Sequence, residues 1–80
     1  MLSAIQQLFT TGKSKIGNYS STTKNEVMKI YYKNCLVCEL NFNTETFTIN
    51  GGESIPKNCF SSLEMAHEKY FSNFKKIVIK

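Results

Sequence analysis

Apolar and polar residues alternate along much of the segment from Val27 to Asn50. Alternation with a period of two is typical of strands that bury one face, because successive side chains of a strand point to opposite sides. We therefore predict a three-stranded antiparallel meander over residues 27–50. The register that gathers the apolar residues pairs Tyr32 with Leu36 across Lys33, Asn34 and Cys35, and then pairs Ile30 with Cys38, Met28 with Leu40, Phe42 with Phe47 and Leu40 with Ile49.

This register predicts one buried sheet face, since a shift of one residue would turn the whole set toward water. Its members are Met28, Ile30, Tyr32, Leu36, Cys38, Leu40, Phe42, Phe47 and Ile49. The opposite, outer face is more polar and carries Val27, Lys29, Tyr31, Val37, Glu39, Asn41, Thr46 and Thr48.

Helical spacing of apolar residues appears on both sides of the meander. Residues 2–11 predict a short amphipathic helix, which Gly12 would end in a left-handed turn. A second helix is expected from about Ser62 to Lys75, because Ser61 and Glu64 have capping-box spacing, and an earlier start near Pro56 stays open. Its apolar stripe should cover the buried sheet face and consists of Leu63, Ala66, His67, Tyr70, Phe71 and Phe74.

The remaining segments give weaker signals. Residues 13–25 are polar, with a turn at Gly17-Asn18, so we expect a mobile loop that holds at most a brief edge strand. Gly51-Gly52 would close the meander in a sharp turn. The β-branched residues 77–79 favour a short terminal strand at a sheet edge. The whole chain, residues 1–80, is therefore predicted to be a single small α+β domain.

The net charge is +4, and all ten basic residues are lysine. Sequence-specific nucleic-acid reading favours the bidentate guanidinium of arginine, so the composition disfavours that function. A coding bias toward A and T competes as an explanation, because Lys, Asn, Ile, Phe and Tyr make up 35 of the 80 residues. The apolar run at residues 1–9 is too short to span a membrane and resembles no export signal, so we expect a protein of the cytoplasm with reduced cysteines.

Cys35 and Cys38 form a C-x-x-C, which with Cys59 and His67 would supply four zinc ligands. Residues three apart on a strand point to opposite faces, so the pattern favours buried thiols over a metal site. A Cys59–His67 nucleophile and base pair lacks an obvious orienting carboxylate. We therefore expect no enzyme activity, no cofactor and no metal.

The outer face suggests binding. Tyr31 beside Val37, with Lys29 and Lys33 near, predicts a mixed apolar and basic patch, to which a loop bearing Tyr19 could add. The leading hypothesis is binding of a protein partner; the alternative is a sequence-tolerant nucleic-acid module that uses Lys13, Lys15, Lys24, Lys29 and Lys33. The amino-terminal helix could instead cover the patch, or it could be an ordinary solvated face. A homodimer through an exposed edge strand is also left open.

Three segments carry a resemblance: residues 15–23, the strand Val27–Tyr32 with its Lys33-Asn34 turn, and Phe47-Thr-Ile-Asn-Gly-Gly52. They are similar to small accessory proteins encoded by tailed phages. The order helix, three strands, helix also resembles small phage inhibitors of bacterial defence, including some anti-CRISPR proteins. The resemblance implies a small protein of the host cytoplasm that inhibits or redirects a host protein; because this chain is basic, it does not imply mimicry of nucleic acid.

Overall fold

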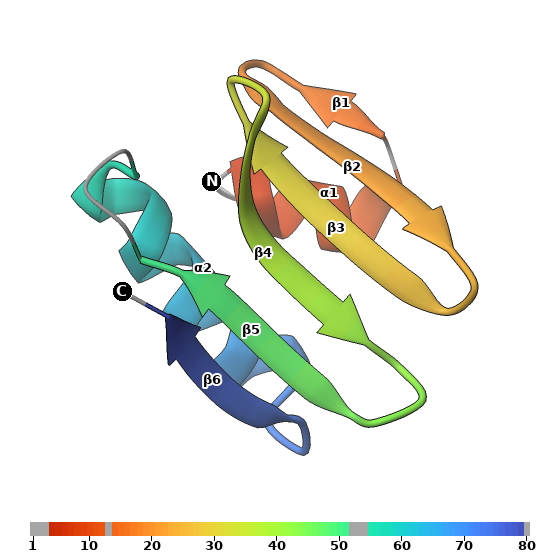
Figure 1. Ribbon diagram of the computed structural model, residues 1–80. Coiled ribbons are helices and arrows are strands. Elements are labelled where there is room, and N and C mark those ends of the chain that lie inside the picture. The colour runs from red at the N-terminus through yellow and green to blue at the C-terminus, as the bar shows by residue number, and fades with distance from the viewer. Residues whose placement is uncertain (1–3, 13, 52–54, 80) are drawn as a thin grey trace.

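The computed structural model describes residues 4–12, 14–51 and 55–79 (Figure 1). The chain forms two helices and six strands in these residues. They are α1 (Ala4–Thr11), β1 (Lys15–Ile16), β2 (Tyr19–Lys24), β3 (Val27–Tyr32), β4 (Cys35–Asn41), β5 (Thr46–Asn50), α2 (Lys57–Tyr70) and β6 (Lys75–Ile79).

The strands make one sheet in which spatial order follows chain order, from β1 to β6. Neighbours are antiparallel except β5 and β6, which are parallel and joined through α2. Both helices lie behind the sheet as drawn in Figure 1, so they cover the same face. The α+β class is confirmed, and the expected meander, β3 to β5, is the centre of a larger mixed sheet.

The first hairpin of the meander keeps part of the expected register. Met28 pairs with Leu40 and Ile30 with Cys38, as predicted, but a bulge follows and pairs Tyr32 with Cys35. The expected three-residue loop is therefore wrong. Lys33 and Asn34 form a two-residue turn, and both have positive φ (49° and 69°), as a type I′ hairpin turn requires.

The bulge changes which side chains face the helices. It leaves Val37 as the extra residue of β4, and this turns Val37 inward, where it is only 2% exposed. Leu36 instead pairs with Tyr31 and lies half-buried on the other face. The prediction was therefore wrong for both residues, because strict alternation does not hold across a bulge.

The second hairpin is shifted by two residues from the predicted register. Leu40 pairs with Phe47 and Cys38 with Ile49, so these paired side chains keep their predicted face. The prediction for Phe42 was wrong, because this residue lies after β4, does not pair with Phe47 and is 39% exposed. The shift arises at Asn41, whose Oδ1 accepts the N–H groups of Asn43 (2.9 Å) and Thr44 (3.1 Å) and so begins the turn before Phe42 could pair.

The polar segment before the meander is more ordered than the sequence indicated. β2 pairs with β3 along its whole length, from Tyr19 opposite Tyr32 to Lys24 opposite Val27. The β2–β3 turn places Asn25 and Glu26 at positive φ (52° and 64°), again as a two-residue hairpin requires. Four consecutive hydroxyl residues, Ser20, Ser21, Thr22 and Thr23, occupy β2, so its sequence shows no alternation of apolar and polar side chains.

The second helix lies earlier than Ser62–Lys75. It begins after Pro56, as the alternative start allowed, and the N-cap residue makes no side-chain hydrogen bond. The capping box at Ser61 was therefore wrong, since the helix is already under way there. The helix ends at Tyr70, and the terminal strand begins at Lys75, two residues before the predicted one.

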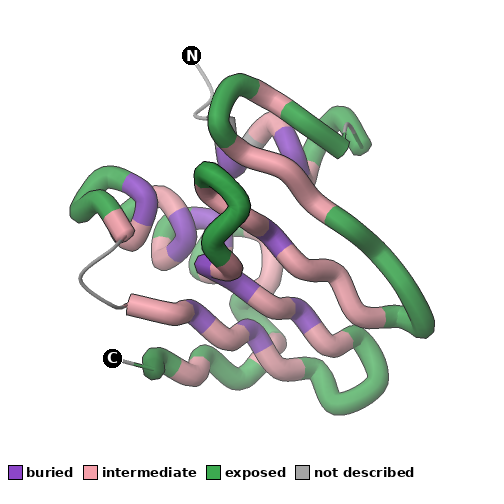
Figure 2. The backbone as a smooth tube through the Cα atoms, turned by 45° about the horizontal axis from the view of Figure 1, so that its top comes forward, coloured by how far each residue is buried: buried purple, intermediate pink, exposed green. Residues whose placement is uncertain are grey.

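The core lies between the two layers, and Figure 2 shows its buried segments on the central strands and the inner sides of the helices. Its fully buried members are Ile5, Leu8, Ile30, Val37, Cys38, Leu40, Phe47, Ile49, Cys59, Leu63 and Ala66. Phe71 packs edge-on against Phe9 at 5.1 Å between ring centroids, and an aromatic cluster thereby joins α1 to the end of α2. The predicted sealing of one sheet face by the second helix is confirmed for Leu63, Leu40 and Phe47.

Candidate functional site: the open sheet face

The sheet face opposite the helices is not covered by any described part of the chain, and we call it the open face (Figure 1). Strand registers place the following residues on it: Lys15, Ser20, Thr22, Lys24, Val27, Lys29, Tyr31, Leu36, Glu39, Asn41, Thr46, Thr48, Asn50, Lys75, Ile77 and Ile79. Four lysines and one glutamate are in this set, so its formal charge is positive.

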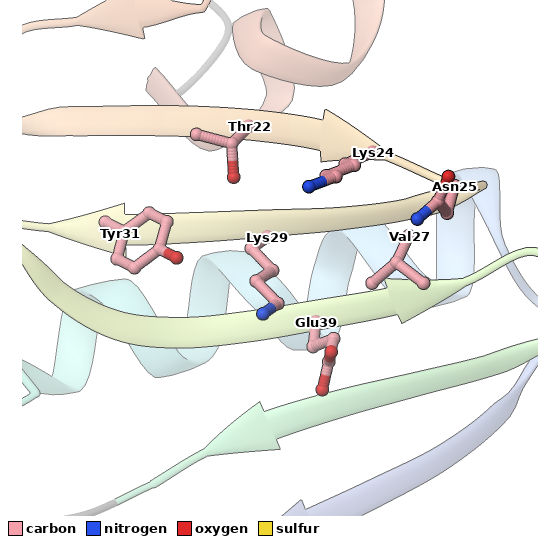
Figure 3. Close-up of a pocket in the computed structure, with 7 residues that line it drawn as sticks. All are labelled: Thr22, Lys24, Asn25, Val27, Lys29, Tyr31 and Glu39. Carbon is pink, nitrogen blue, oxygen red and sulfur yellow. The ribbon is translucent and has the colours of Figure 1, made fainter.

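A shallow concavity of about 440 Å³ lies on the open face over β2, β3 and β4. Figure 3 shows its lining: Thr22, Lys24, Asn25, Val27, Lys29, Tyr31 and Glu39. Lys29 occupies the centre, because its neighbours across the ladder are Thr22 on β2 and Glu39 on β4. The concavity therefore offers an aromatic ring, two ammonium groups and one carboxylate on rigid strands.

The structure brings together only part of the predicted patch. Lys29 and Tyr31 are neighbours in the concavity. Val37 lies on the opposite side of the sheet, inside the core, so its predicted place on the outer face is wrong. Tyr19 belongs to a strand rather than a loop and packs on the helix side, with its ring 4.9 Å from that of Tyr32. Lys33 lies in the β3–β4 turn, with Nζ 5.6 Å from the Tyr32 ring centroid.

Tyr19 and Lys33 instead line a second depression, of about 320 Å³, at one end of the sheet. Lys15 joins them there, with Gly17, Asn18, Ser20 and Asn34. Of the lysines predicted for nucleic acid, Lys24 and Lys29 thus lie in the concavity, Lys15 and Lys33 lie in the second depression, and Lys13 is outside the described residues.

The buried cysteines have protonated thiols. Burial raises the pKa of Cys38 and of Cys59, and hydrogen bonding to Tyr19 only partly offsets the effect at Cys59. Burial, with the same hydrogen bond, also raises the pKa of Tyr19. Cys35 is exposed. No group of three metal-ligating side chains lies together among the described residues. This arrangement suits packing, because a reactive thiol needs a lowered pKa.

His67 has a structural contact. Its Nε2 lies 2.7 Å from the carbonyl oxygen of Phe74, and its ring meets Phe47 edge-on at 5.2 Å. A carbonyl only accepts, so Nε2 carries the proton and the ring donates. Nδ1 is buried without a hydrogen-bond partner in the described chain. The contact fixes the turn between α2 and β6.

Sequence reasoning missed two parts of the open face. Leu36 was assigned to the core, because nothing in residues 35–38 signals a bulge. Ile77 and Ile79 were expected in an edge strand, but their pairing partner and therefore their face could not be read from the sequence. The parallel register with β5 places both beside Thr48 and Asn50.

Comparison with protein families, curated proteins and solved structures finds no match for this chain. No helix in the described ranges has the length and apolar character needed to cross a membrane. The case for a function therefore depends on the open face itself.

Proposed function

We propose that this chain is a non-enzymatic binding protein whose open face binds a host protein and inhibits or redirects it. One observation carries the proposal: a six-stranded sheet has helices on one face only, and its other face places Tyr31 among lysines in a concavity. The setting we propose is that of a phage or mobile-element accessory protein in the host cytoplasm, of the anti-defence type that includes anti-CRISPR proteins.

The composition of the open face supports a protein partner. Antiparallel sheets with one solvated face usually carry polar residues there. Here Val27, Tyr31, Leu36 and Ile77 are each at least half-buried, and Tyr31 and Leu36 are direct neighbours across β3 and β4. Tyrosine binds at low entropic cost because it has few rotatable bonds and both an apolar ring and a hydroxyl. Lys24 and Lys29 around it would favour an acidic rim on the partner.

Capture from host lysate tests the proposal. Wild-type protein should retain one stoichiometric host protein, and Tyr31→Ala should weaken binding by at least about 30-fold, because loss of a central aromatic anchor costs about 2 kcal/mol or more. Met65→Ala is the matched control, since Met65 is 57% exposed on α2, away from the open face. Binding that Tyr31→Ala leaves intact would rule out the open face as the interface.

A second function has its own observation. Lys24 and Lys29 lie beside Tyr31, while Lys15 and Lys33 gather at the end of the sheet. A basic track with an aromatic ring on a sheet can hold single-stranded nucleic acid by phosphate attraction and base stacking.

Gel shift with single-stranded DNA and RNA separates the two functions. Nucleic-acid binding should weaken steeply with salt, with a slope of about −0.7 per phosphate contacted. Lys29→Gln and Lys33→Gln should each reduce that slope. The absence of a mobility change at low salt would rule out nucleic-acid binding, and binding of a host protein would then be the remaining proposal.

A further inference from the structure

The sheet has two edges, and they differ greatly. At one end, β1 is only two residues long, which leaves little backbone for pairing. At the other end, β6 is a regular five-residue strand, Lys75–Ile79, and no described strand pairs with its outer edge (Figure 1). Edge strands of folded proteins are normally short, bulged or charged, because free backbone groups invite another strand.

The hydrogen bonds to β5 define which groups of β6 are free. The N–H of Lys75 donates to Glu45 O (2.8 Å), and the carbonyl of Ile79 accepts from the N–H of Gly51 (2.6 Å). Because backbone groups alternate along a strand, Lys75, Ile77 and Ile79 face β5, whereas the N–H and C=O of Lys76 and Val78 point outward.

Two apolar side chains of β6 are exposed at this edge. Val78 is 37% exposed and Ile79 is 52% exposed, and they are two of the four large apolar side chains most exposed among the described residues. An inward-pointing lysine on an edge strand usually opposes pairing. Lys76 is such a residue, but its Nζ lies 3.2 Å from the Glu64 carboxylate on α2, so its charge is balanced.

We propose that β6 pairs antiparallel with β6 of a second copy of this chain, with the two-fold axis at Ile77. This register places Lys76 opposite Val78 of the second copy, and the reverse. Both outward-facing residues of each strand then form hydrogen-bonded pairs. A register centred on Lys76 would put two lysines face to face.

The lysines closest to each other in this register are the two Lys76 residues, which lie two positions apart along the ladder, about 7 Å, and so within the Debye length of about 8 Å at physiological salt. Each has its Nζ 3.2 Å from the Glu64 carboxylate of its own chain, which offsets their repulsion. The two Lys75 residues lie opposite Ile79 of the other copy, about 13 Å apart, so their repulsion is weak. The lysine stems would cover the exposed Val78 and Ile79 side chains.

The pairing has a consequence for the open face. A two-fold axis perpendicular to the sheet keeps the helices of both copies on one side, so the two open faces become one continuous surface. That surface carries two copies of the concavity around Lys29. The inference does not depend on the proposed function, because a dimer forms or fails to form without any partner.

Light scattering coupled to size exclusion tests the pairing with the full chain. The wild type should have twice the chain mass of 9.1 kDa at high concentration. Val78→Lys should reduce it to a single chain mass, since the new ammonium would face Lys76 of the second copy. Met65→Lys adds the same charge at an exposed apolar site away from β6 and should stay dimeric.

A second variant, Val78→Pro, and a second measurement, amide exchange, separate loss of the dimer from loss of the fold. Val78→Pro removes an outward N–H that β5 does not use, so it should leave the folded monomer intact while abolishing the dimer. The circular dichroism spectrum checks folding. Amide exchange at Lys76 and Val78 should be slow in the concentrated wild type and fast in Val78→Lys.

Three results would overturn the proposal. They are a wild type of single chain mass at every concentration, a dimer that persists in both Val78 variants, and slow exchange at Lys76 and Val78 only after a host protein is added. The third result would mean that an extended segment of that protein, rather than a second copy, occupies the edge.

Discussion

Replacing Val37 and Leu36 separately by alanine tests the bulge that sets the composition of the open face. Val37 is 2% exposed in the core, whereas Leu36 is half-buried on the open face. Val37→Ala removes two buried carbon atoms with their hydrogens, and burial of each contributes about 0.8 kcal/mol to stability. Because the change also leaves a cavity, we expect it to lower the free energy of unfolding by about 2 kcal/mol. Leu36→Ala leaves no enclosed cavity and should cost about 1 kcal/mol or less.

Urea denaturation followed by circular dichroism measures both values. A domain of 80 residues has a total stability of about 4–12 kcal/mol, so the Val37→Ala loss is easily resolved. The melting temperature should fall by roughly 8–16 °C for Val37→Ala, at about 4–8 °C per kcal/mol. The strictly alternating register makes the opposite prediction. A larger loss for Leu36→Ala than for Val37→Ala, at an unchanged m value, would refute the bulge.

Three further predictions concern other parts of the fold. Gly51→Ala should destabilise the protein by about 1–3 kcal/mol in the same denaturation assay, because the new Cβ would lie 3.0 Å from the Phe60 ring. Stability should fall as pH rises above about 9, because burial raises the pKa of Cys38 and of Cys59 above their ordinary value of 9.0 and only the unfolded chain then loses these protons; Cys38→Ala should reduce the slope of that part of the pH profile and leave the share of Cys59 and Tyr19. Glu64→Gln should cost no more than about 0.5 kcal/mol, and less at high salt, because the Glu64–Lys76 pair is over a third exposed; a larger loss would mean that Glu64 has another role.

Local patterns in the sequence predicted much of the central sheet. The alternation of apolar and polar residues predicts that Met28 pairs with Leu40 and Ile30 with Cys38, because a shift of one residue would turn the apolar side chains toward water. The helical spacing of Leu63 and Ala66 likewise predicts the face that α2 buries. Both patterns can be read from the sequence, because the apolar side chains of a segment themselves indicate which of its faces is buried.

Other features depend on tertiary contacts that no local pattern reports. β2 consists of small hydroxyl residues and lysine after Tyr19, so it is a strand because β3 offers it a partner. The two-residue Lys33-Asn34 turn pairs Tyr32 with Cys35, whereas farther along the hairpin Ile30 pairs with Cys38. β4 therefore has one residue more than β3 between these two pairs, and that residue is Val37. Helix α2 ends before Phe71, although Phe71 and Phe74 continue the apolar spacing, because both rings pack on the core from outside the helix.

In the candidate site, too, local patterns predict some residue positions and tertiary contacts determine others. Lys29 and Tyr31 were placed correctly on the open face by simple alternation. Tyr19 was assigned to a mobile loop, and its actual position against Tyr32 follows from the β2–β3 ladder. Whether Lys29 and Tyr31 bind a protein stays a prediction that only partner capture can test.

Helices seal one face of the sheet, whereas the other face, around Tyr31, is accessible to solvent. Paramagnetic relaxation of the protein's NMR signals by an inert soluble probe measures this difference between the two faces. We expect strong relaxation of the Tyr31, Leu36 and Ile77 side chains, with Val37 and Leu40 protected. Protection of Tyr31 and Leu36 as complete as that of Leu40 would contradict it.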